Sequence, residues 1–370
     1  MNIRLHKQNA GVALIVVMIA ITVLSMMAAM FAFSMKVETK LAANANSEQQ
    51  LLWLGRSGVE LARYVVSEQL RVPNQPYDSL NQVWAGGPGG DSSTNSSLSG
   101  LSLDNYAIGD GTVSVKIIDL ERKVNVNSAN GQIIQQALTL MGVDASDISV
   151  ISDSIQDWVG PGDAPRVAGA KSDFYQSLTP PYYCKDAPMD DLTELLLVRG
   201  ILDHPEIYWG GSASNHQGAV FQHKLGFGNS PGEEPDYPFG LSEIFTPFST
   251  GKININTADA TVLQMIPGVD ADTAEAIIKQ RAGPDGADGT DDDIPYRSPS
   301  QIGAAGVNPQ LAAQIGNYCT VRSSTFEVHV TAQVGLVSRE YVAILYRPGN
   351  SPDVQVVRFY WINPNAAKLQ

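Results

Sequence analysis

The sequence predicts an α+β fold in which one long N-terminal helix packs on an antiparallel sheet, with a large, mainly α-helical domain inserted between strands. Three observations predict it. The chain opens with an uncharged apolar run that continues in helical spacing, with no proline before Pro73. Apolar and polar residues alternate over 112–120 and again over 325–361, as in half-buried strands. Between these regions, helical spacings are broken by prolines.

The N-terminal run is long enough to cross a membrane. Residues 12–35 carry no charge, and two basic residues, Arg4 and Lys7, precede them. A helix of 24 residues is roughly 36 Å long, whereas a hydrocarbon layer is about 30 Å thick. A removable secretory signal has a shorter apolar core, although Ala28 and Ala29 could imitate its cleavage site. The basic residues predict a cytoplasmic N-terminus and a body exported across the membrane.

The same helix is expected to continue beyond the membrane. From Lys36 to Leu70, apolar residues recur at three- and four-residue spacings among polar neighbours. This predicts one helix from Val12 to about Leu70, half in lipid and half against a soluble body. Pro73 ends it, and the Gly- and Ser-rich segment 86–100 is typical of a flexible loop.

Composition excludes several classes of function. Lys and Arg number 24 against 38 Asp and Glu, a formal net charge of −14, so the body repels the phosphates of nucleic acid and of anionic lipid. The five histidines fit no metal-ligand or catalytic spacing. Asp153 and Asp157, one helical turn apart, are more typical of solvated or metal-linked carboxylates than of an acid/base pair. No enzyme is predicted.

The two cysteines, Cys184 and Cys319, leave two alternatives open. In an oxidising compartment they could form a disulfide that closes a long loop. They could equally be two separate buried thiols, because sequence alone does not place their Cα atoms within bonding reach.

The region between the strands contains two similar segments. KVNVNSA at 123–129 is matched by KININTA at 252–258, each an alternating strand that leads toward a helix, with Ser128 or Thr257 expected as its N-cap. Two copies are too few for a repeat array, and the simpler interpretation is that two strand-to-helix segments converged on similar sequences. Helices are predicted in this region at five places, 131–141, 146–158, 189–199, 260–266 and 272–281, with long loops over 204–243.

The last two of these helices resemble a helix-hairpin-helix. Pro267, Gly268 and Val269 join them, and such a glycine turn can present backbone amides to a phosphate. Here Asp270 and Asp272 follow the turn, and their carboxylates repel phosphate. A packing hairpin is therefore expected rather than DNA binding.

An acidic loop, GPDGADGTDDDI at 283–294, is the candidate metal site. Five aspartates spaced by glycines could wrap around a Ca²⁺ ion, which takes six to eight oxygens, although the EF-hand pattern is lacking. A solvated acidic surface loop is the alternative. The five residues are Asp285, Asp288, Asp291, Asp292 and Asp293.

Strong alternation closes the chain, over 325–336, 340–346 and 354–361. These segments predict an antiparallel meander, and the strand at 112–120 is a natural partner for it.

Taken together, these features resemble a known family. The carrying motifs are QNAG before VALIVV, DWVGPGDAPRVAGAKSDFY, DDLTELLLVRGI, and GKININTADATVL followed by the acidic loop and terminal strands. Across nearly the whole chain they resemble type IV pilin-like proteins, and among these the K-component minor pseudopilins of type II secretion systems (the GspK family). The resemblance implies five parts: a prepilin leader (1–11), a transmembrane and polymerisation helix (12–35), the N-terminal part of a pilin-like domain (36–129), an inserted helical domain (130–320), and C-terminal strands that complete the pilin-like domain (321–370).

The resemblance also implies processing and partners. A prepilin peptidase would cut between Gly11 and Val12 and methylate the new amine. Most pilin-like subunits carry Glu at the fifth mature position, where this chain has Val16. A subunit without that acid suits the tip of a fibre better than its shaft, because a neighbour's buried amine would lack its counter-charge.

The implied partners are the I- and J-component minor pseudopilins, the major pseudopilin, the inner-membrane assembly platform and, at the tip, secreted cargo. The body would be periplasmic on a single-pass inner-membrane helix. Two rivals stay open: a type IV pilus minor pilin with an adhesive or DNA-uptake role, and a membrane-tethered Ca²⁺-dependent hydrolase, for which the sequence offers no nucleophile constellation.

Overall fold

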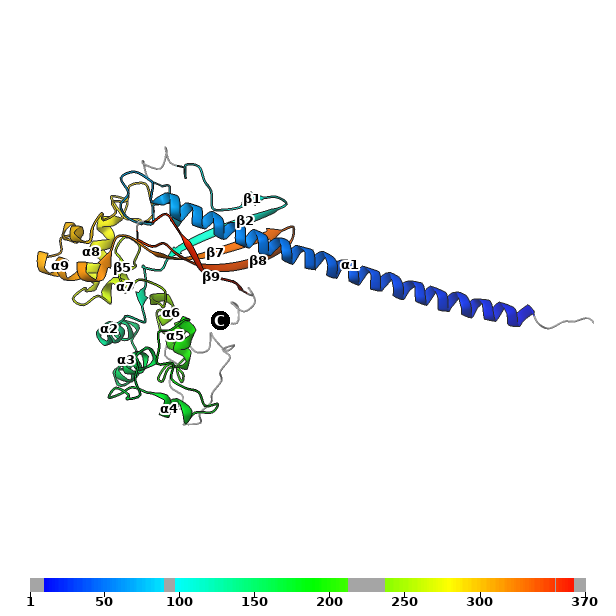
Figure 1. The fold of residues 1–370 in the computed structure, drawn as a ribbon, viewed down its shortest axis with the longest axis horizontal. Coiled ribbons are helices and arrows are strands. Elements are labelled where there is room, and N and C mark those ends of the chain that lie inside the picture. Colours follow the sequence, from blue (N-terminus) through cyan, green and yellow to red (C-terminus); the bar gives the residue numbers. More distant parts are fainter. Residues whose placement is uncertain (1–9, 90–96, 212–236, 350, 363–370) are drawn as a thin grey trace, which may run out of the picture.

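The computed structural model describes residues 10–89, 97–211, 237–349 and 351–362. Its dominant element is α1, Ala10–Gln69, a single helix of 60 residues. The first half of α1 projects from the body as a bare rod, and the second half lies along a sheet (Figure 1). The predicted unbroken helix is confirmed.

A five-stranded antiparallel sheet carries the second half of α1. The strands are ordered β1-β2-β7-β8-β9. Their bounds are β1 Tyr106–Ile108, β2 Gly111–Asp119, β7 Thr325–Val334, β8 Val337–Tyr346 and β9 Gln355–Ile362. This confirms the predicted meander and the pairing of the 112–120 strand with it, since β2 lies antiparallel to β7. The three-residue β1 was not predicted.

Two glycines let α1 approach the sheet closely. A Cβ added to Gly55 would lie 2.4 Å from the ring of Tyr341, and one added to Gly58 would lie 2.4 Å from a methyl group of Val330. Around them, apolar side chains of α1 and of the facing strands form one buried cluster, which includes Leu51 and Val66. The absence of side chains at Gly55 and Gly58 therefore lets the helix lie close to the sheet, and apolar burial around them holds it there.

The region between β2 and β7 builds a second buried cluster of its own. Its α-helices are α2 Gly131–Met141, α3 Ala145–Val159, α4 Ser172–Gln176, α5 Glu206–Trp209, α6 Leu241–Ile244, α7 Ala260–Gln264, α8 Ala271–Arg281 and α9 Pro309–Tyr318. Its two described 3₁₀ helices are η3 Leu192–Leu197 and η5 Pro299–Ala305, and η1 Val83–Ala85 lies before the sheet. These elements gather beyond and beside the end of the sheet that lies away from the bare rod (Figure 1).

One predicted helix is much shorter than expected. The spacing over 189–199 predicted a helix, but only η3 forms there. The Met189 amide donates to the side chain of Asn127 at 2.7 Å, and Asp191 caps the first turn by accepting from Thr193. A tertiary contact therefore occupies the residues with which the helix was expected to begin.

The two similar segments, 123–129 and 252–258, also share a local structure. β3 (Val124–Asn125) pairs in parallel with β4 (Phe245–Thr246), and β5 (Ile253–Asn254) pairs in parallel with β6 (Cys319–Thr320). The strand in each segment ends on an asparagine, and the side-chain oxygen of that asparagine accepts from the amide two residues later. The distance is 2.8 Å for Asn125 and 3.0 Å for Asn254. Both copies therefore enter the same Asx turn.

That turn overturns the expected caps. Ser128 and Thr257 do not cap α2 and α7; the caps are Asn130 and Asp259, two residues later, whose side chains accept from the third amide along. Ser128 and Thr257 directly follow the Asx turns, and their amides donate to the carbonyls of Asn125 and Asn254. The Thr257 hydroxyl instead donates to Asp119 at 2.6 Å.

Candidate functional site

The candidate site is the bare half of α1. Within the described residues, α1 is the one helix long and apolar enough to cross a membrane, and its most apolar stretch is 0% buried. Large apolar side chains point outward all round it, from Val12 to Met35. A helix that is apolar on every side needs lipid or other helices around it.

The predicted processing residues lie at the start of this rod. Gly11 and Val12 are in the first turns of α1, while residues 1–9 of the expected leader lie outside the described residues. Val16 is 59% exposed, so the fifth position after Gly11 presents an apolar side chain to whatever surrounds the rod. Cleavage at Gly11 stays a prediction.

A groove opens where the rod meets the body. It encloses about 500 Å³ between α1 and the strands β8 and β9, and an ion pair of Glu48 with Arg339 crosses its rim. Trp361 of β9 is 61% exposed beside it, and the ring of Tyr341 stacks on Phe359 with centroids 5.5 Å apart. The full lining is Glu48, Gln49, Leu52, Arg339, Tyr341 and Trp361.

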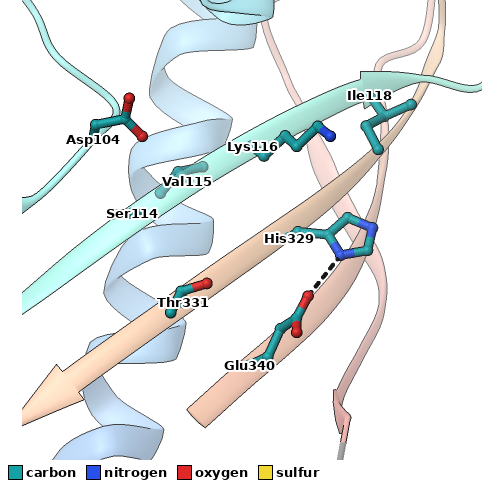
Figure 2. Close-up of a pocket in the computed structure, with 8 residues that line it drawn as sticks. All are labelled: Asp104, Ser114, Val115, Lys116, Ile118, His329, Thr331 and Glu340. Carbon is teal, nitrogen blue, oxygen red and sulfur yellow. Dashed lines mark hydrogen bonds and ion pairs between the residues drawn. The ribbon is translucent and has the colours of Figure 1, made fainter. Parts of the chain in front are cut away.

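The sheet face away from α1 carries a smaller polar hollow around His329 (Figure 2). The Nε2 atom of His329 lies 2.7 Å from a Glu327 oxygen, and its Nδ1 atom lies 3.1 Å from a Glu340 oxygen. An ionised carboxylate only accepts, so both contacts are hydrogen bonds at once only when both ring nitrogens carry a proton, as in the imidazolium form. The hydrogen bond to Glu327 raises the pKa of His329, and the ring links Glu327 on its own strand with Glu340 on β8.

The acidic loop is folded by its own carboxylates. Asp288 receives two hydrogen bonds from Arg281, at 3.0 and 2.7 Å, and Asp292 accepts from the Asp285 amide at 3.0 Å. Asp293 accepts from the Gly289 amide at 2.8 Å. Across the described ranges, no group of three or more His, Cys, Asp or Glu side chains is arranged to hold a metal ion. A cation would have to replace some of these contacts, and calcium binding stays a prediction.

Asp153 and Asp157 anchor a loop. Asp157 is buried and accepts from the Arg166 amide at 2.9 Å and from its guanidinium at 3.0 Å, while Asp153 accepts from the Ala168 amide at 3.1 Å. The motif DWVGPGDAPRVAGA is thereby explained as one loop tied at its base to α3. Both carboxylates hold the backbone of this loop in place.

The cysteines are free and buried, so the bridge considered between Cys184 and Cys319 is not formed. Each thiol lies in the core of the inserted region as a separate group. Burial raises the pKa of Cys184 to about 11 and that of Cys319 to about 12, which leaves both in the unreactive thiol form.

The helical hairpin is used for packing. Asp270 caps α8 by accepting from the Thr273 amide at 2.9 Å. The turn glycine Gly268 lies against Leu311 of α9, and the Gln314 side chain donates to the Pro267 carbonyl at 3.2 Å. The turn therefore lies against a neighbouring helix.

Comparisons with known proteins agree with this geometry. Residues 112–207 match the family model for type II secretion system protein K, and residues 249–284 match the helix-hairpin-helix motif. Type II secretion system protein K of Klebsiella pneumoniae is 23% identical over 211 residues, which are 53% of this chain and 59% of that protein. Its counterpart in Aeromonas hydrophila is 22% identical over 215 residues, covering 53% and 60%. The matched region thus spans about three-fifths of the length of these relatives.

A solved structure extends the likeness to the fold. A chain of the GspK-GspI-GspJ complex from enterotoxigenic Escherichia coli superposes with a TM-score of 0.60 at 18% identity, over 87% of this chain and 99% of that one. The shared features are the α+β, pilin-like arrangement of long helix, sheet and helical insertion. The family match over residues 112–207 and the sequence relatives make this chain similar to type II secretion system protein K, and the solved structure shows that the two share a fold.

Proposed function

We propose that this protein stands at the tip of a type II secretion pseudopilus, where it initiates or caps assembly for protein export across the outer membrane. The observation that carries the proposal is the bare half of α1: it is apolar on all sides, and it lacks the acid at the fifth position after Gly11. Such a helix can leave lipid and enter a bundle of similar helices without losing its apolar surroundings.

The missing acid favours an end position. Inside an apolar bundle, a neighbour's N-terminal amine needs a counter-charge, since an unpaired charge there is costly. Val16 supplies no counter-charge, and no residue from Val12 to Met35 is charged. A subunit that ends the bundle has one fewer neighbouring amine to neutralise.

The shape of the body supports the same position. The inserted region lies beyond and beside the end of α1 that is farthest from the bare rod (Figure 1). Further subunits stacked along the direction of α1 would meet this region, whereas subunits displaced toward the membrane would meet the free rod.

The groove at the base of the body is the contact we propose for neighbouring pseudopilins. Residues 36–50 of α1 leave the body as a largely polar helix, exposed at every described position except Ser47, which is half-buried. A lone polar helix of this length is marginal in water, so a partner beside it would stabilise it. The related chain was solved with GspI and GspJ, and we infer that the I and J components contact this protein along the rod and into the groove.

Processing and location complete the proposal. A prepilin peptidase removes residues 1–11 and methylates Val12, the rod is held in the bacterial inner membrane with its N-terminus in the cytoplasm, and the body is periplasmic. The assembly platform and the major pseudopilin then receive it. Cargo contact at the tip and a non-enzymatic role belong to the same proposal.

Immunogold electron microscopy of sheared pseudopili tests the position. With an antibody against the body, gold is expected at one end of each fibre. Label along the shaft would contradict the tip proposal. Label on surface pili that are built without the secretion components would favour the rival type IV pilus role.

A further inference from the structure

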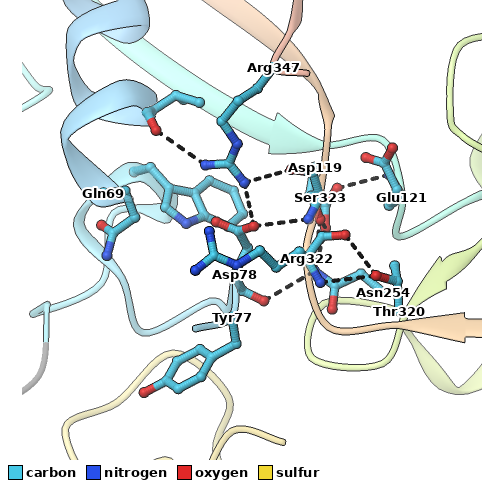
Figure 3. Close-up of polar contacts among 12 residues, drawn as sticks. Gln69, Tyr77, Asp78, Asp119, Glu121, Asn254, Thr320, Arg322, Ser323 and Arg347 are labelled. Atoms are coloured by element: carbon cyan, nitrogen blue, oxygen red, sulfur yellow. Dashed lines mark hydrogen bonds and ion pairs between the residues drawn. The ribbon is translucent and has the colours of Figure 1, made fainter. Parts of the chain in front are cut away.

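Both chain crossings between the sheet and the inserted region pass through one buried polar cluster, here called the joint. It consists of Asp78, Asp119, Glu121, Ser323 and Arg347, each at most 1% exposed (Figure 3). Asp119 and Glu121 lie where the chain leaves β2, and Ser323 lies where it returns to β7. The joint is thus the place where the inserted region is fastened to the sheet.

Asp119 bridges the two sides through neutral donors. Its carboxylate accepts from the Glu121 amide at 2.8 Å and from the Ser323 hydroxyl at 2.6 Å, both on the connecting segments. From the inserted region it accepts from Asn254 at 3.0 Å and from Thr257 at 2.6 Å. Four donors make Asp119 a well-held anion without a cation.

Glu121 is held less well. One of its oxygens accepts from the Thr325 amide of β7 at 3.0 Å, and the other accepts from the Thr250 amide of the inserted region at 3.3 Å. Its own backbone amide donates to the Asp119 carboxylate at 2.8 Å, so the two buried acids lie within one hydrogen-bonded turn, and no cation of the described residues is hydrogen-bonded to Glu121.

The cation of the joint, Arg347, and the neighbouring Arg322 are already engaged with other groups. The Arg347 guanidinium is paired with Asp78 and donates to the carbonyls of Ser323 at 2.5 Å and Val66 at 3.2 Å. Arg322 donates to the Pro76 carbonyl at 3.0 Å. The remaining groups facing the pair from the inserted region, Thr250, Asn254 and Thr257, are neutral.

Charge balance then assigns the proton. With Glu121 neutral, the joint holds two carboxylates, Asp78 and Asp119, against one guanidinium, Arg347; ionising Glu121 would add another buried negative charge without a cation. Burial, and then the charge of Asp119, raise the pKa of Glu121 to about 8. Burial also raises the pKa of Asp119, against the hydroxyls of Ser323 and Thr257.

We propose that Asp119 and Glu121 share one proton at neutral pH, and that losing this proton loosens the attachment of the inserted region to the sheet. The step is a simple deprotonation: the proton passes to water and leaves two adjacent anions in the joint. Since both acids hold backbone or side chains from either side of the joint, repulsion between them acts directly on the fastening.

The direction with pH follows from linkage. A folded-state pKa of about 8 lies above the ordinary Glu value of about 4.3. The stability that the proton gives to the folded state is therefore complete below about pH 4. Its contribution to the folding equilibrium constant falls about tenfold per pH unit above that, and it is lost above about pH 8.

Infrared spectroscopy of the full chain in detergent micelles tests the shared proton. The carbonyl stretch of a buried protonated carboxyl is expected at pH 6.5 in the wild type and is expected to fade toward pH 9. Glu121→Gln is expected to remove it, while Glu60→Gln, at a surface position with a side chain 62% exposed, is expected to keep it. A wild type without this band at pH 6.5, or a band that persists in Glu121→Gln, overturns the proposal.

Amide hydrogen exchange tests the loosening. Relative to core sheet amides such as that of Val330, protection of the Thr250 and Thr325 amides is expected to fall about tenfold between pH 7 and pH 9 in the wild type and to stay constant in Glu121→Gln. An equal fall in the wild type and in Glu121→Gln overturns the proposal that deprotonation loosens the joint.

Should Glu121→Gln fail to fold, Asp119→Asn gives a second readout. Without the Asp119 charge, Glu121 is expected to lose its proton at a lower pH, and an unchanged midpoint contradicts the shared proton. These measurements use the isolated protein, so their outcome is independent of the tip position proposed above.

Discussion

At the residue scale, Gly11 defines where the rod begins. Because the small residue must enter a peptidase site, Gly11→Leu is expected to leave the full-length precursor, whereas the wild type is expected to start at Val12. Intact mass spectrometry of the purified protein measures this. Ala29→Leu, a change of the same kind within the apolar run, is expected to be processed normally. A wild-type chain that still starts at Met1 would contradict the pilin-like processing.

His329 is the residue-scale pH prediction. Its pKa is raised chiefly by the hydrogen bond that the ring donates to Glu327, so the stabilisation is complete below about pH 6 and is lost as the pH rises through the raised value. His329→Gln is expected to cost about 1 kcal/mol in free energy of unfolding at pH 5.5 and much less at pH 9. Denaturant unfolding at both pH values measures it.

The control for this prediction is His204→Gln. His204 pairs with Glu206, but its side chain is 53% exposed against 26% for His329, so a smaller change is expected. An equal loss at both pH values in His329→Gln would mean that packing rather than charge is what the ring supplies.

Prediction from sequence succeeded and failed at this scale for identifiable reasons. The buried acids and arginine of the joint were missed because Asp78, Asp119 and Arg347 are far apart in the sequence and carry no shared spacing. Ser128 and Thr257 were assigned as caps because both are good N-cap residues, but the asparagine three positions earlier in each copy forms an Asx turn first. Only a tertiary partner such as Asp119 reveals what Thr257 does.

At the scale of elements, the fit of α1 on the sheet depends on its two glycines. Gly→Ala in a helix usually stabilises by about 1 kcal/mol, yet the new methyl group of Gly58→Ala would overlap Val330. We expect a net loss of roughly 1–3 kcal/mol, since overpacking outweighs propensity. Thermal unfolding measures it; Ser57→Ala on the same helix should change little. A stabilised Gly58→Ala protein would contradict the close seating.

The acidic loop is the element whose chemistry is open. Calorimetry with Ca²⁺ on the full chain in detergent is expected to give a binding signal that disappears in the double variant Asp291→Ala, Asp293→Ala. Asp104→Ala with Asp110→Ala, outside the loop, is the control and is expected to bind normally. A wild type without a signal would leave the loop as a hydrogen-bonded surface turn held by Arg281.

Elements were predictable where one period dominates. The apolar spacing of α1, α2 and α3 and the alternation of β2 and β7 are all set by local pattern, and each element forms close to its expected bounds. The shortened helix around η3 was not predictable, because Asn127, more than sixty residues away, fixes its first residues.

At the scale of the whole molecule, the tip position rests on a missing acid and on a wide body, and one substitution separates them. Val16→Glu supplies the acid, while the inserted region still lies across the direction in which further subunits would stack (Figure 1). If the body is decisive, immunogold label stays at one end of each pseudopilus in Val16→Glu, as in the control Val16→Ala. If label spreads along the shaft, the acid alone had confined the protein to the end. We expect the first result, because a charge at Val16 can neutralise a neighbouring amine but creates no room for another subunit beyond the body.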